Sequence, residues 1–155
     1  MLAYEDFKTL HILGVVIFLG NIIVTGIWKY RADATRRPEV IAFAQRLVTL
    51  TDWVFTLGGV VLILIGGFGM VGVAGLDIAQ TPWIEHGLTF FVASGVIWVL
   101  ILIPIQVVQA RMARAFETGG VIPDRYWWLS RQWYIWGFIA TVLPLLNIYV
   151  MVQKV

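Results

Sequence analysis

Four long hydrophobic runs, separated by short polar segments, dominate the pattern of this chain. They cover residues 7–30, 54–76, 87–110 and 132–153, and only Lys8 and Lys29, near the ends of the first, are charged. About 20 helical residues, each rising about 1.5 Å, cross a hydrocarbon layer of about 30 Å. A membrane barrel would instead show alternating segments of about 10 residues. The pattern predicts an all-α integral membrane four-helix bundle, a single domain over residues 1–155 with spans at about 7–30, 53–76, 84–110 and 130–153.

Composition supports lipid as the solvent of this chain. It is 60% hydrophobic and 13% charged, whereas soluble domains are about 45–50% apolar and about 25% charged. Cysteine is absent, which excludes disulfides and thiol chemistry. The first run follows Glu5 and Asp6 rather than a basic cluster and is too long for a signal-peptide core, so we expect it to be retained as a span.

The charges predict an orientation. Of the 11 basic residues, only Lys8 and Lys154 lie away from the two connections that follow the first and third runs. The positive-inside rule therefore places these connections in the cytoplasm and both termini outside, in a multi-pass protein of the bacterial inner (plasma) membrane. The connections are too short to favour a nucleic-acid partner. The basic residues in them are Lys29, Arg31, Arg36, Arg37, Arg46, Arg111, Arg114, Arg125 and Arg131.

Several positions within and next to the hydrophobic runs predict local structure, and some have alternative interpretations. Pro38 suits a first helical turn, and an amphipathic segment is expected to lead into the span. Asp52 is interpreted as a cap where the span begins, with a proton-relay role as the alternative. Gly59 and Gly66 share a helix face, which favours close helix packing over a smooth wall against a flat ligand such as porphyrin. Pro104 and Pro144 are expected to kink the third and fourth helices.

The only two histidines, His11 and His86, begin the first and third runs. Both helices run in the same direction, and the helical rise places the rings about 5–6 Å inside their spans. The first and third helices of an up-and-down bundle lie diagonally across its core. The two imidazoles are therefore candidate metal ligands that could hold one haem b iron between them, with Met70 as a competing axial ligand. Each histidine could instead form hydrogen bonds near the interface, and His86 is close enough to Glu85 and Trp83 to face the surface.

A partly polar strip continues inward from His11 along the first helix, through Asn21 and Thr25. Such residues usually form hydrogen bonds between helices. Asn21 is also a candidate cofactor-binding residue, for haem propionates or for a quinone headgroup.

The opening KTLHILGVVIFLGNIIVTGIWKYRA and the closing IYVMVQKV resemble an uncharacterised family of predicted four-helix bacterial membrane proteins, over essentially the whole chain. More distantly, Lys8-x-x-His11 followed by Gly20 and a basic helix end is similar to the J-type membrane protoporphyrinogen oxidase, and the chain also resembles the copper-resistance D-type membrane domain. The oxidase resemblance implies an association with b-type haem. The segment from Trp83 to Gly87 lacks the Lys of the oxidase pattern.

These features lead to one functional hypothesis and one alternative. The first is a b-type haem protein with a redox or porphyrin-related role, such as a haem-dependent membrane oxidoreductase, whose partners besides the bilayer would be a quinone or redox protein and a second copy of the chain. The alternative is a non-enzymatic membrane subunit or small-solute carrier with structural histidines. A Soret band would separate the two.

Overall fold

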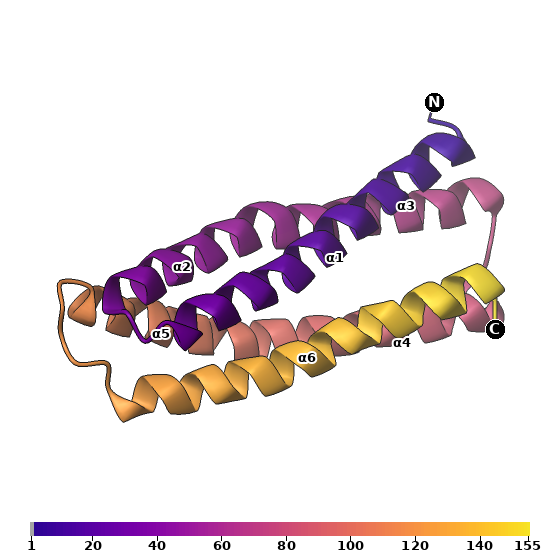
Figure 1. Ribbon diagram of the computed structural model, residues 1–155. Helices are drawn as coiled ribbons and strands as arrows, with labels where there is room; N and C mark the ends of the chain where they lie inside the picture. Colours follow the sequence, from indigo (N-terminus) through magenta and orange to yellow (C-terminus); the bar gives the residue numbers. More distant parts are fainter. Residues whose placement is uncertain (1) are drawn as a thin grey trace.

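The computed structural model describes residues 2–155, which fold into four long helical segments running up and down (Figure 1). The first segment is α1 (Tyr4–Ala34). The second is continuous and consists of α2 (Pro38–Thr51), the π-helical turn η1 (Asp52–Thr56) and α3 (Leu57–Ala74). The amphipathic lead-in to the second span is therefore part of the same long helix.

The short 3-10 turn η2 (Ile78–Gln80) connects to the third segment. That segment consists of α4 (Pro82–Ile97), the π-helical turn η3 (Trp98–Leu102) and α5 (Ile103–Phe116), and the fourth is α6 (Asp124–Gln153). All four segments are long and apolar enough to cross a membrane, and residues 2–155 contain no strand. The predicted all-α membrane bundle is confirmed.

The segments pair as two hairpins. α1 packs along α3, α4 packs along α6, and α2 meets α5 where the hairpins come together. Both termini and η2 lie at one end of the bundle, which we call the terminal end (Figure 1). The connections at residues 35–37 and 117–123 lie at the other end, which we call the basic end because basic residues of the first connection and of the adjoining helix ends gather there. In the described chain α1 has no substantial interface with α4, so the first and third segments are diagonal, as an up-and-down bundle requires.

Glycines allow α1 and α3 to approach closely. A Cβ on Gly59 would lie 2.9 Å from the carbonyl oxygen of Gly14, and one on Gly66 would lie 2.5 Å from the backbone nitrogen of His11. Side chains at these positions would push the helices apart. The helix-packing interpretation of Gly59 and Gly66 is confirmed, because both face α1 rather than an open wall.

Asp52 does not cap a helix, so that interpretation was wrong. Its backbone N–H donates to carbonyls of α2, including that of Val48, and the helix continues through it to Ala74. The π-helical turn that starts at Asp52 widens the backbone there, and the side chain is buried inside the bundle. π-Helical turns of this kind are frequent at functional sites.

The prolines disturb their helices in different ways. Pro104 lies two residues after the end of η3, where the helix loosens because proline lacks an N–H and its ring crowds the preceding turn. Pro144 lies inside α6, which continues through it. The carbonyl of Ala140, four residues earlier, has lost its usual donor and accepts a hydrogen bond at 2.8 Å from the Ser94 hydroxyl of α4 instead.

Lys29 is buried in the bundle and is not an exposed charge of the first connection. Only 1% of its side chain is exposed, and its Nζ lies 3.1 Å from Asp33 Oδ2. Asp33 also accepts hydrogen bonds from the hydroxyls of Tyr126 (3.1 Å) and Tyr134 (2.7 Å) on α6. The pair is neutral overall, so Lys29 adds no free positive charge to its connection. Eight basic residues of the two connections still favour the predicted orientation.

Cysteine labelling tests that orientation. Ala34 and Gly120 are exposed at the basic end, and the chain has no native cysteine. In intact cells, Ala34→Cys and Gly120→Cys should react with a thiol reagent only after the membrane is permeabilised. Leu2→Cys, at the exposed terminal end, is the matched control and should react without permeabilisation. Labelling of Ala34→Cys or Gly120→Cys without permeabilisation would contradict the predicted orientation and indicate the opposite one.

Candidate functional site

Two cavities lie between the hairpins. The end cavity, of about 570 Å³, opens near the terminal end, and the central cavity, of about 560 Å³, lies deeper. Both linings include Phe18, Phe91 and Pro144, so the cavities adjoin at these three side chains. Volumes of this size are typical of sites for small molecules and cofactors.

The end cavity combines apolar walls with a cationic rim. Residues from α1, α3, α4 and α6 line it, and its only charged lining residues are Lys8 and Lys154. Nζ of Lys154 lies 5.6 Å from the centre of the Trp83 ring, and Lys8 pairs weakly with Glu5 at 3.5 Å. An occupant with an apolar body and negative groups at one edge would match this lining.

His11 is held in a defined orientation at this cavity. Its Nδ1 lies 2.9 Å from the carbonyl oxygen of Ile63 on α3, and the ring lies against Gly67. A carbonyl only accepts hydrogen bonds, so we assign the ring proton to Nδ1, which leaves Nε2 with a lone pair. Metal-binding histidines commonly have their second nitrogen fixed in this way.

The predicted cofactor ligands are not all brought together. Met70 lines the end cavity with His11. His86 is exposed, does not line the cavity, and has its Nδ1 3.5 Å from the carbonyl oxygen of Val155. Asn21 lines neither cavity and instead donates to Asp52 and Thr56. Within residues 2–155, no three His, Asp or Glu side chains gather in the manner of a metal site.

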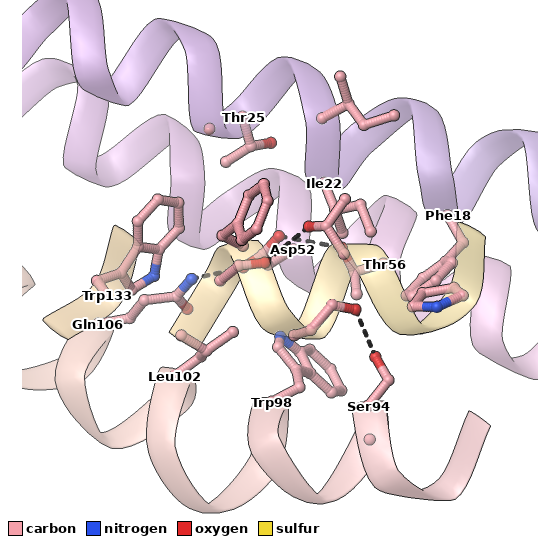
Figure 2. A pocket seen from close by; sticks show the side chains of 18 of the residues that line it. Phe18, Ile22, Thr25, Asp52, Thr56, Ser94, Trp98, Leu102, Gln106 and Trp133 are labelled. Carbon is pink, nitrogen blue, oxygen red and sulfur yellow. Dashed lines mark hydrogen bonds between the residues drawn. The ribbon is translucent and has the colours of Figure 1, made fainter. Parts of the chain in front are cut away.

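A buried polar cluster borders the central cavity (Figure 2). Asp52 Oδ1 accepts hydrogen bonds from Asn21 Nδ2 and Thr56 Oγ1, each at 3.0 Å, and Asp52 Oδ2 accepts one from Gln106 Nε2 at 2.6 Å. Thr25 donates in turn to Asn21 Oδ1 at 3.3 Å. All of these donors are neutral, so the cluster holds a carboxyl group with no cation bonded to it. A buried acid of this kind within a membrane helix is a candidate functional group.

The sequence over residues 6–155 matches the family described as "Predicted integral membrane protein (DUF2269)". The chain belongs to this family. The predicted membership of an uncharacterised four-helix membrane family is thereby confirmed, and the protein is an integral, multi-pass membrane protein. Neither a curated protein nor a solved structure matches the chain.

The sequence did not predict that the residues around the central cavity come together as one site. Asp52, Gln106 and the indoles of Trp98 and Trp133 come from three segments and are far apart in the chain. Each has an ordinary explanation when taken alone, as a cap, an interhelical hydrogen bond or an interface anchor. The available signal was the position of two polar residues: Asp52 directly precedes the second span, and Gln106 lies inside the third apolar run.

Proposed function

We propose that the end cavity binds b-type haem and that His11 would hold its iron. The observation that carries this proposal is the orientation of His11. Its Nδ1 is engaged by the Ile63 carbonyl, so Nε2 is the nitrogen available to a metal in a cavity with mainly apolar walls. Imidazole held through its other nitrogen is a common iron ligand.

The lining matches the chemistry of haem. A porphyrin is a flat apolar ring with two propionates on one edge. The walls are mainly aliphatic and aromatic, and Lys8 and Lys154 supply two cations on the rim. Met70, on the same lining, would offer a soft thioether as a further iron ligand in this proposal.

The residues of the chain have separate roles in this site. Ile63 fixes the tautomer and rotation of His11, and Gly67 leaves room for its ring. Lys8 and Lys154 would pair with the anionic groups of a bound haem. The apolar walls exclude water. When bound, haem supplies one-electron chemistry, and the protein would act as a membrane redox or porphyrin-handling protein.

Spectroscopy of the purified protein tests the proposal. Protein expressed with haem supply should show a Soret band, and His11→Ala should abolish it or shift it strongly. His86→Ala is the matched control, because that imidazole is exposed outside the cavity, and its spectrum should equal wild type. Met70→Ala should shift the reduced-minus-oxidised spectrum. Protein that remains colourless after haem loading, or a His11→Ala spectrum equal to wild type, would refute the proposal.

The alternative is a non-enzymatic membrane subunit or carrier with structural histidines, and one observation favours it. The His11–Ile63 hydrogen bond also ties α1 to α3, which is a purely structural role. In that case the protein binds no haem, and His11→Ala lowers stability without any spectral change.

A further inference from the structure

Among residues 2–155, Asp52 is the one charged side chain that lines the central cavity. It is 7% exposed, and it accepts hydrogen bonds from the neutral side chains of Asn21, Thr56 and Gln106. No ion pair to it forms within the described chain. An ionised carboxylate buried without a cation is costly, so a positively charged occupant of the cavity would be stabilised beside it.

The neighbouring ion pair does not balance this charge. The Tyr134 hydroxyl, which belongs to the cavity lining, donates to Asp33 at 2.7 Å, and Asp33 pairs with Lys29 at 3.1 Å. That pair is neutral overall. The central cavity is therefore negative when Asp52 is ionised, whereas two lysines line the end cavity. An unmatched charge of the same sign rejects a ligand, so the phosphate of a phospholipid or the carboxylate of a fatty acid is disfavoured in the central cavity.

Aromatic rings make up much of the remaining wall. They come from the first, third and fourth segments and include Phe18, Phe91, Trp98, Trp133, Tyr134 and Phe138. The π-helical turns η1 and η3 bring Asp52 and Trp98 to the cavity from opposite hairpins (Figure 2). The faces of such rings attract cations, and groups of aromatic rings recognise quaternary ammonium ligands. The aromatic wall and the acid therefore favour the same sign of charge.

The cavity opens sideways to lipid. Its lining includes Ile27 of α1, which is 59% exposed, and Phe138 of α6, which is 70% exposed. Side chains this exposed in the hydrophobic part of a membrane bundle face the bilayer. A hydrophobic molecule dissolved in the membrane can therefore reach the cavity without crossing the polar ends of the bundle.

The apolar walls disfavour an inorganic cation. Such an ion needs several oxygen ligands in place of its water. Within residues 2–155 no three His, Asp or Glu side chains gather, and the oxygens of the Asp52 carboxyl already accept three hydrogen bonds. A cation that carries its own apolar groups matches both the acid and the walls.

We infer that the central cavity binds a lipophilic organic cation, such as a quaternary ammonium or phosphonium ion with apolar substituents. Asp52 supplies the opposite charge, the aromatic rings surround the substituents, and the opening between Ile27 and Phe138 admits the cation from the bilayer. The volume of about 560 Å³ is in the range of small-molecule sites. This site is separate from the end cavity and does not depend on haem.

Two ions of the same shape and opposite charge test the inference on the purified full-length protein. Radiolabelled tetraphenylphosphonium, with uptake by empty micelles subtracted, should bind saturably. Asp52→Asn keeps the shape of the side chain and removes its charge, so it should weaken this binding roughly tenfold or more. Uptake of tetraphenylborate should be the same in wild type and Asp52→Asn.

Further variants locate the binding. Gly137 lines the cavity and has open space at its Cβ position, so Gly137→Leu should fill the site and abolish phosphonium binding without blocking folding. Trp98→Leu should weaken binding roughly threefold through the lost ring. The matched controls are Asp124→Asn and Trp128→Leu, which change exposed residues outside both cavities and should bind as wild type. His11→Ala should also leave phosphonium affinity unchanged, which separates this site from the proposed haem site.

The outcomes are distinguishable even if one variant fails to fold, which circular dichroism would show. Loss of phosphonium binding in Gly137→Leu, with borate uptake unchanged, supports the inference without Asp52→Asn. Non-saturable phosphonium uptake, wild-type affinity in folded Asp52→Asn or in Gly137→Leu, or borate uptake that falls in Gly137→Leu as phosphonium binding does would overturn it.

Discussion

Asp33→Ala is expected to lower the free energy of unfolding by about 3–5 kcal/mol, because it leaves the ammonium of Lys29 buried without its carboxylate. Lys29 is 1% exposed, and Asp33 accepts hydrogen bonds from Lys29, Tyr126 and Tyr134. The substitution also removes a tie between α1 and α6. Unfolding in mixed micelles with increasing dodecyl sulfate, followed by circular dichroism, measures the loss.

Two variants control this prediction. Glu5→Ala removes the acid of an exposed pair with Lys8 and should change stability by no more than about 0.5 kcal/mol. The double variant Lys29→Met/Asp33→Asn removes the buried charge and keeps an acceptor for the tyrosine hydroxyls, so it should recover most of the loss. If Asp33→Ala is as stable as Glu5→Ala, or the double variant is no better than Asp33→Ala, the pair does not hold the basic end together.

Gly66→Ala is expected to destabilise the α1–α3 hairpin by about 1–3 kcal/mol, which is the usual cost of overpacking. The new Cβ would lie 2.5 Å from the backbone nitrogen of His11 and 2.6 Å from the carbonyl oxygen of Phe7, and backbone atoms cannot rotate away. Because His11 would have to move, haem retention should fall as well under the proposed function. The same micelle unfolding assay and the Soret absorbance measure the two effects.

Gly72→Ala is the matched control. It lies on the same helix, and nothing is within 4 Å of its Cβ position, so alanine there should be neutral or stabilising by up to about 1 kcal/mol through helix propensity. Equal stability of Gly66→Ala and Gly72→Ala would mean that the close approach of α1 and α3 is not needed for the fold.

Of the candidate haem ligands chosen from the sequence, the structure places two at one cavity and the third outside it. His11 and Met70 were chosen from position within hydrophobic runs, and both line one cavity. His86 was placed at a matching depth by the helical rise, yet it is exposed outside that cavity. Depth along a helix follows from counting residues, whereas the direction of a side chain around the helix depends on how the helices pack.

The hydrophobic and charge patterns are enough to predict the class of protein, namely four apolar helices in up-and-down order with the basic residues mostly at one end. The physical reason is that lipid requires every backbone group to be paired within a helix, so runs of this length admit one secondary structure. Tertiary structure alone decided that Asp52 meets Gln106 and that Lys29 is buried with Asp33. Because lipid outside and core inside are both apolar, the hydrophobic pattern does not say which face of each helix turns inward, and these pairings appear only when the helices pack.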